Sequence, residues 1–179
     1  MELILVRHPQ PDLAPGLCYG SSDVAVAANV LEQAQRQLTP LLRPALDGGM
    51  RLVASPLQRC AALAARLGPF DTDARLAEMH FGAWELQPWD AIPRAEVDAW
   101  AADLLDYRPG GGESVNEVAA RVRAFLDELT HDAVLLCHAG TIRLIAAMAA
   151  GEPLLQAAAK PNQIKYCAMQ RLSWPAKPV

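Results

Sequence analysis

The chain has 179 residues, of which 52% are hydrophobic and 20% charged, and its formal net charge at pH 7 is −4. This composition predicts one soluble globular domain over residues 1–179, and the acidic balance argues against a nucleic-acid partner. The 4 cysteines form no Cys-x-x-Cys pair, so we expect neither a zinc site nor a disulfide framework. No apolar run approaches the roughly 18 residues that span a bilayer, and no signal peptide is recognisable, so we expect a cytoplasmic protein without a membrane partner.

Apolar runs and helical periodicity predict strands that alternate with helices along the chain. We expect strands over residues 3–8, 51–55, 71–77, 133–137 and 163–172, and helices over residues 27–46, 56–67, 90–105, 115–129 and 141–150. Pro40 and Pro44 are expected to kink or break the first helix. Ser55 and Pro56 are typical of a helix start, with the serine as N-cap. Strands separated by helices predict an α/β fold with a largely parallel sheet.

Arginine and histidine side chains follow three of the predicted strands. Arg7 and His8 close the first strand, Arg59 lies one helical turn beyond the second, and His138 directly follows the fourth. Because parallel strands present their carboxyl ends at one edge of the sheet, we expect these side chains to share a pocket. A phosphoryl group suits such a pocket, since arginine binds its oxygens in pairs. The helix that begins near Thr141 adds its N-terminal dipole and free amides.

Five short motifs occur in a fixed order along the chain. They are Arg7-His8, Ser55-Pro56-Leu57-Gln58-Arg59, Leu76-Ala77-Glu78 with Phe81-Gly82-Ala83-Trp84-Glu85, Gly111-Gly112-Glu113-Ser114, and His138-Ala139-Gly140-Thr141-Ile142-Arg143. In these motifs and their order the chain resembles the histidine phosphatase superfamily, the phosphoglycerate-mutase-like group. The resemblance implies a three-layer fold in which helices cover both faces of a largely parallel sheet.

The resemblance also implies a mechanism. His8 would be the nucleophile and would form a phosphohistidine, while Arg7, Arg59 and His138 would hold the phosphoryl oxygens. Glu78 would be the general acid for the departing alkoxide and then the base for the incoming water, a role that contributes roughly 10²–10⁴ in rate. Neither a metal nor another cofactor is implied, and the expected partner is a small-molecule phosphate ester.

The segment after His8 departs from the family pattern. Pro9 stands where the family usually has glycine, and Pro11 and Ala14 replace the usual threonine and asparagine. The oxygen contact normally made by that asparagine is expected to come from Gln10 or Tyr19. The expected substrate-binding residues are Gln10, Tyr19, Gly20, Trp84 and Ala139.

Three further motif residues are expected to be structural. We expect Glu85 to anchor a loop and Ser114 to cap the following helix. Arg143 is expected to make an ion pair beneath the site.

The loop over residues 15–23, together with the Arg-His-Pro opening, looks most like α-ribazole-5′-phosphate phosphatases of cobalamin synthesis. A small lid over residues 86–112 favours hydrolysis over the mutase reaction, because water can reach the phosphohistidine. A broad-specificity small-molecule phosphatase, a phosphoglycerate mutase-like enzyme and a non-catalytic phospho-ligand-binding protein are the alternatives. The apolar segment at residues 164–169 suggests pairing across a homodimer.

Overall fold

The computed structural model describes residues 1–175 and contains a five-stranded sheet in the order β3-β2-β4-β1-β5. Its strands are β1 (Glu2–Arg7), β2 (Arg51–Ala54), β3 (Asp71–Thr72), β4 (Ala133–Cys137) and β5 (Met169–Ser173). Neighbouring strands are parallel except for β5, which pairs antiparallel with β1 at one edge. The prediction of a largely parallel α/β fold is therefore confirmed.

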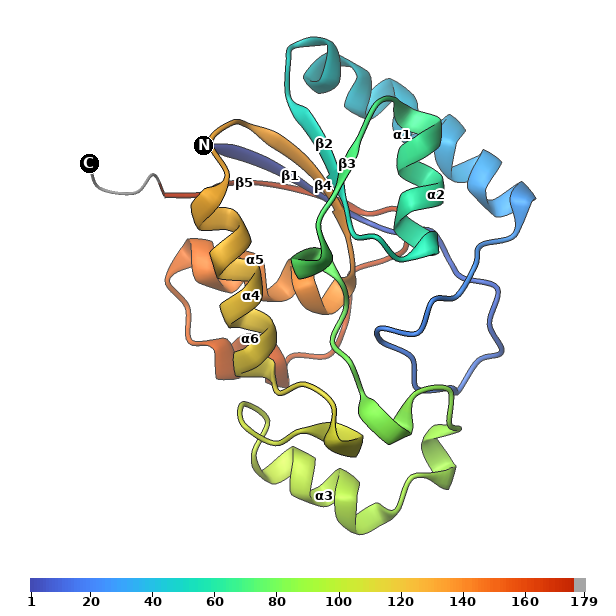
Figure 1. Ribbon diagram of the computed structural model, residues 1–179, viewed down its shortest axis with the longest axis vertical. Helices are drawn as coiled ribbons and strands as arrows, with labels where there is room; N and C mark the ends of the chain where they lie inside the picture. The colour runs from blue at the N-terminus through green and yellow to red at the C-terminus, as the bar shows by residue number, and fades with distance from the viewer. Residues whose placement is uncertain (176–179) are drawn as a thin grey trace.

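Helices cover both faces of this sheet (Figure 1). They are α1 (Ala28–Asp47), α2 (Gln58–Leu67), α3 (Arg94–Ala102), α4 (Val115–Glu128), α5 (Ala139–Ala150) and α6 (Leu154–Ala159). Alternate residues of the strands point to opposite faces, so Ile4 and Val6 pack against α1 and α2, whereas Leu3 and Leu5 pack against α4 and α5. None of the helices in the described part of the chain is long and apolar enough to cross a membrane.

The strands β1 and β4 each lie between two other strands, and helices cover both of their faces. Residues 3–6 and residues 133–137 are completely buried. This burial explains why both strands are continuous apolar runs rather than alternating ones. Their position brings the residues that follow Arg7 and Cys137 side by side, since those two residues pair in register.

Several predicted elements differ from the structure. The helix α1 continues through Pro40 and Pro44 without a break, and both prolines are exposed, so water can satisfy the carbonyls that lose a partner. The predicted strand over residues 71–77 is only β3, followed by a 3-10 turn at Ala74–Leu76. The short helix α6 was not predicted, and the last strand begins only at Met169.

The start of α2 corrects another prediction. This helix begins at Gln58, and its N-cap is Leu57 rather than Ser55. The Ser55 hydroxyl accepts only a long hydrogen bond from the backbone N–H of Leu57, at 3.4 Å, and lies much closer to His138, 2.8 Å from its Nε2. The shorter hydrogen bond of Ser55 is therefore made to a residue distant in sequence and not to the start of α2.

The helix α3 and the turns around it lie apart from the sheet (Figure 1), and we call this segment, residues 81–112, the lid. The lid is anchored where a turn at Gly82–Trp84 approaches a second turn at Pro109–Gly111. A Cβ on Gly82 would lie 2.0 Å from the carbonyl oxygen of Gly110, so only glycine allows this approach. Two of the motifs noted in the sequence thus meet backbone to backbone at the base of the lid.

Candidate active site

The carboxyl edge of the sheet opens into a cavity of about 370 Å³. His8 follows β1, His138 follows β4 as the N-cap of α5, and Arg59 lies in the first turn of α2. The two imidazole rings lie 5.1 Å apart between their centroids. The structure therefore brings together the side chains that sequence reasoning placed at three separate strand ends.

His8 is held as a neutral imidazole with one free nitrogen. Its side chain is buried, and its Nδ1 lies 2.7 Å from the carbonyl oxygen of Pro9, to which it donates. Burial and the nearby guanidiniums of Arg59 and Arg7 lower the pKa of His8 to about 3. The Nε2 lone pair is consequently available at neutral pH. Pro9, which lacks an amide proton, contributes its carbonyl oxygen instead.

Arg59 is completely buried and is fixed by three acceptors. Its Nε donates to His138 Nδ1 at 3.2 Å, and its Nη1 donates to the carbonyl oxygen of Ser22 at 2.7 Å. Its Nη2 donates to the carbonyl oxygen of Gly20. A guanidinium has five N–H donors, so two remain for a ligand.

His138 lies behind the cavity rather than on its wall. Because the Nε of Arg59 can only donate, His138 Nδ1 accepts, and the Nε2 proton is directed to the Ser55 hydroxyl. Burial, together with His8 and the neighbouring arginines, lowers the pKa of His138 well below its ordinary range. With both ring nitrogens occupied, His138 orients Arg59 in this structure.

Arg7 has a donor without a partner. Its Nη1 donates to the carbonyl oxygen of Ile164, and its guanidinium carbon lies 3.9 Å from the ring centre of Tyr166. The buried Nε has no hydrogen-bond partner. An unpaired buried donor costs roughly 1–3 kcal/mol, so a ligand oxygen that reached it would relieve that cost.

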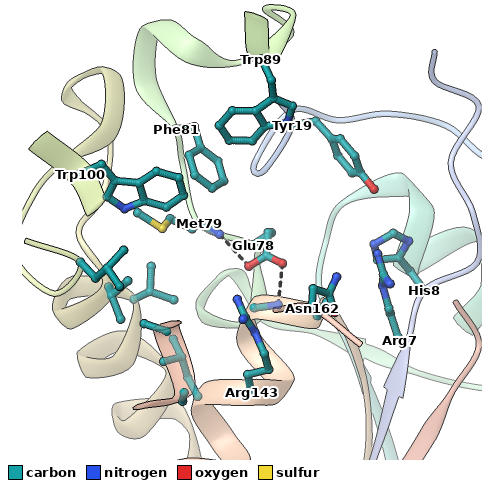
Figure 2. A pocket seen from close by; sticks show the side chains of 18 of the residues that line it. Arg7, His8, Tyr19, Glu78, Met79, Phe81, Trp89, Trp100, Arg143 and Asn162 are labelled. Atoms are coloured by element: carbon teal, nitrogen blue, oxygen red, sulfur yellow. Dashed lines mark hydrogen bonds between the residues drawn. The ribbon is translucent and has the colours of Figure 1, made fainter. Parts of the chain in front are cut away.

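Glu78 lines the same cavity and is fixed at the start of α5 (Figure 2). Its Oε2 accepts from the backbone N–H of Gly140 at 2.9 Å, and its Oε1 accepts from that of Met79 at 3.1 Å. Its own carbonyl is bound by Arg121, which also pairs with Glu113 at 2.7 Å. These contacts place a carboxyl group across the cavity from His8.

Glu85 anchors the loop that binds Arg59. Its carboxylate accepts from the backbone N–H groups of Gly20, Ser21, Ser22 and Phe81 at 2.9–3.2 Å. Burial opposes ionisation, but the hydrogen bonds from Phe81 and Ser22 prevail and hold the pKa of Glu85 below its usual value. The carbonyls of that loop are thereby positioned for the guanidinium.

Only two of the five predicted substrate-binding residues line the cavity. Tyr19 and Ala139 line the cavity, and Gly20 contributes through its carbonyl to Arg59. Gln10 is exposed and does not line the cavity. Trp84 does not line it either, because it is buried with Cys18 and Ile92 in a small separate core and donates to Glu96 at 2.7 Å.

The aromatic wall of the cavity comes from other lid residues. Trp89 and Trp100 are stacked, with ring centroids 6.2 Å apart and planes inclined by 7°. Phe81 meets both of them edge to face. All three rings lie on the side of the cavity away from Arg7 and His8 (Figure 2).

Arg143 and Asn162 are cavity residues that sequence reasoning missed. The expected ion pair of Arg143 is absent, since no carboxylate within residues 1–175 lies in salt-bridge distance. Its Nη1 donates instead to the carbonyl oxygen of Lys160 at 2.5 Å, and its Nε is unpaired. Figure 2 shows both side chains beside Glu78, midway between His8 and the aromatic wall. Asn162 carries no local signal, because it lies in an irregular loop.

The fold and the site define an α/β protein with an anion pocket built around a neutral histidine. A family model of the histidine phosphatase superfamily (branch 1) matches residues 3–177. The chain therefore belongs to the histidine phosphatase superfamily, and it is a phosphatase enzyme of that superfamily. Within residues 1–175, no group of three or more His, Cys, Asp or Glu side chains is arranged to hold a metal ion.

Curated relatives and solved structures agree with this assignment. The chain is 30% identical to glucosyl-3-phosphoglycerate phosphatase of Mycobacterium tuberculosis, over 82% of this chain and 74% of that protein. It is 26% identical to adenosylcobalamin/alpha-ribazole phosphatase of Salmonella typhimurium, over 82% of this chain and 78% of that protein. A phosphoglycerate mutase structure from Thermus thermophilus superposes with a TM-score of 0.76 at 28% identity, covering 98% of this chain and 95% of that one.

Proposed function

We propose that the enzyme hydrolyses small-molecule phosphate monoesters through a phosphohistidine at His8. The observation that carries the proposal is the state of His8, a neutral imidazole whose Nδ1 proton is bound by Pro9 and whose Nε2 is free. In the first step Nε2 attacks phosphorus, the ester P–O bond breaks, and Glu78 gives a proton to the departing alkoxide. In the second step Glu78 takes a proton from water, water attacks phosphorus, and the P–N bond breaks.

The free donors around His8 suit the charge that develops during transfer. The unpaired Nε of Arg7 and the remaining N–H groups of Arg59 are available to the equatorial phosphoryl oxygens. Such pre-positioned donors are a major source of catalysis in phosphoryl transfer. His138 contributes by holding Arg59 in the required orientation.

The shape of the cavity supports a substrate whose alcohol carries a flat apolar group. Stacked Trp89 and Trp100 offer an aromatic surface, and Leu104, Val115 and Leu144 extend it. We propose α-ribazole-5′-phosphate as the substrate, in agreement with the activity for which the Salmonella relative is named. Broad activity on small phosphate esters is the second candidate. Arg143 and Asn162 favour it, because they could also receive the polar part of other leaving groups.

A phosphate-release screen tests this proposal. The substrates are α-ribazole-5′-phosphate, glucosyl-3-phosphoglycerate, 3-phosphoglycerate and p-nitrophenyl phosphate, and the control is His8→Ala. We expect the highest kcat/KM on α-ribazole-5′-phosphate and no turnover by His8→Ala. Equal rates on all esters would favour the broad phosphatase, and phosphoryl exchange on 3-phosphoglycerate without phosphate release would favour a mutase. A cytoplasmic location and a homodimer stay predictions, to be checked by fractionation and light scattering.

A further inference from the structure

Two tyrosines cover the two arginines of the site. The guanidinium carbon of Arg7 lies 3.9 Å from the ring centre of Tyr166, and that of Arg59 lies 5.5 Å from the ring centre of Tyr19. The two tyrosine hydroxyls are hydrogen-bonded to each other at 3.0 Å. We call Tyr19 and Tyr166 the tyrosine pair. It joins the loop after β1 to the loop before β5 directly over the arginines.

The tyrosine pair borders the space in front of the nucleophile. The ring of Tyr166 lies 5.6 Å from the ring of His8 between centroids. Tyr19 lines the cavity, and Figure 2 shows its hydroxyl on the side of the ring that faces His8. A phosphoryl group bonded to His8 would therefore lie close to the Tyr19 hydroxyl.

The hydroxyl pair has one proton more than its own hydrogen bond uses. Each tyrosine carries one O–H donor, and the bond between them needs only one. Burial is the largest cause that raises the pKa of Tyr19 to about 12, so Tyr19 keeps its proton at neutral pH. If Tyr166 donates to Tyr19, the Tyr19 proton is free to point into the cavity.

The loop after His8 offers few hydrogen-bond donors of its own to a phosphoryl oxygen. Pro9 and Pro11 have no amide proton, and Ala14 has no polar side chain. Gln10, the other candidate from sequence, is exposed and lies off the cavity wall. Among the candidates named from sequence for this contact, Tyr19 alone reaches the cavity.

We propose that the tyrosine pair is part of the phosphate site, with Tyr166 orienting both Arg7 and the Tyr19 hydroxyl, and Tyr19 donating its hydrogen bond to a nonbridging phosphoryl oxygen. This proposal rests on the proposed phosphatase function. Tyr19 touches the substrate, whereas Tyr166 is a positioning residue that acts through Tyr19 and Arg7. No proton is transferred, since the hydroxyl only donates a hydrogen bond to the charged oxygen.

The test uses Tyr19→Phe, Tyr166→Phe and the double variant, because phenylalanine keeps each ring over its arginine and removes only the hydroxyl. The third tyrosine of the chain, Tyr107, packs against Trp84 in the lid and supplies the matched control Tyr107→Phe. Two quantities are measured on each full-length variant: kcat/KM with p-nitrophenyl phosphate, and the affinity for orthovanadate, which mimics the five-coordinate phosphoryl group.

We expect Tyr19→Phe to lower both quantities about 10–100-fold, as for loss of a hydrogen bond to a charged group. Tyr166→Phe should lower them about 3–10-fold, and the double variant should match Tyr19→Phe within about twofold, because the Tyr166 hydroxyl acts through Tyr19. Tyr107→Phe should change neither quantity. A further variant, Tyr166→Leu, should lose more than Tyr166→Phe, since it also removes the ring stacked on Arg7.

Two results would overturn the proposal. One is wild-type vanadate affinity in Tyr19→Phe, and the other is additive losses in the double variant, which would make the two hydroxyls independent. Failure of the proposed function gives a different result: the wild-type enzyme would then release no phosphate and its His8→Ala variant would behave identically. The two failures are therefore distinguishable within one experiment.

Discussion

The close approach of Gly140 to Glu78 allows one substitution to move one carboxyl group and little else. A Cβ on Gly140 would lie 2.4 Å from Glu78 Oε1, far inside contact distance. The backbone N–H that binds Glu78 Oε2 at 2.9 Å is retained in alanine, so the change is purely steric. Because the carboxyl group is the flexible end of its side chain, Gly140→Ala should displace Glu78 and leave α5 in place.

The expected losses follow from the role of a general acid. A positioned proton donor contributes roughly 10²–10⁴ in rate, so Gly140→Ala should lower kcat on an alkyl phosphate by about 10²-fold. The loss in kcat/KM should stay below about tenfold on p-nitrophenyl phosphate, whose leaving group is stable without a proton. Alanine gains up to about 1 kcal/mol over glycine in a helix. The weakened Glu78 hydrogen bonds, worth about 1 kcal/mol each, offset this gain, so Tm should change by only a few degrees.

Steady-state kinetics on the two esters and thermal unfolding measure these effects. Glu78→Gln is the matched variant, and the double variant Gly140→Ala/Glu78→Gln should be no slower than Glu78→Gln alone. The reasoning is refuted if Gly140→Ala keeps its rate on the alkyl ester. It is refuted equally if the double variant loses the product of the two single effects.

Three further predictions concern positioning, selectivity and pH. Glu85→Gln should destabilise the fold by about 1–3 kcal/mol at pH 7, because the loop that binds Arg59 loses a carboxylate acceptor; chemical denaturation measures the loss. Since the pKa of Glu85 is held below its ordinary value of 4.5, the difference from wild type should shrink as pH falls below that value. Arg143→Met should raise KM about tenfold for glucosyl-3-phosphoglycerate and leave p-nitrophenyl phosphate unchanged. The pH profile of kcat/KM should show no loss from protonation of His8 between pH 7 and pH 5, because its pKa is about 3.

Each of these predictions has a contradicting outcome. A stability difference for Glu85→Gln that is constant from pH 7 to pH 3 would mean that the carboxylate charge is not what holds the loop; Glu32→Gln, on the exposed face of α1, is its control. Equal changes in KM on both esters would show that Arg143 supports the fold rather than the leaving group. Titration of the His8 imidazole near pH 6.5, followed by NMR in the wild-type enzyme and assigned with His8→Ala, would contradict the neutral nucleophile.

The fold and the cluster of Arg7, His8, Arg59 and His138 were predictable because their signals are local. Completely buried strands such as β1 and β4 need apolar residues on both faces, and the sequence therefore carries them as continuous runs. Parallel pairing then places Arg7 and Cys137 in register, which brings His8 next to His138. The motif around Arg59 places this arginine beside the two histidines, and that prediction does not depend on the conformation of any loop.

The hydrogen bond between Ser55 and His138 could not be predicted from the residues around either of them. A serine before a proline has the chemistry of an N-cap, but the shorter hydrogen bond of Ser55 is to a buried imidazole 83 positions away. In the same way, Trp84 belongs to a recognisable motif yet packs in the lid core, while Trp89 and Trp100 face the cavity. Which tryptophans of this segment face the cavity depends on how the lid packs against the rest of the chain, and no periodicity in the sequence encodes that.

The sequence by itself determined the class of fold, the family, and the cluster of arginines and histidines at the carboxyl edge of the sheet, since each of these depends on short apolar runs and short motifs. The tertiary structure decided how those residues are used. It shows that the carbonyl oxygen of Pro9 accepts from His8, that His138 accepts from Arg59, and that the Tyr166 hydroxyl is hydrogen-bonded to that of Tyr19. These contacts join positions distant in sequence, so their energies depend on packing that no local stretch specifies.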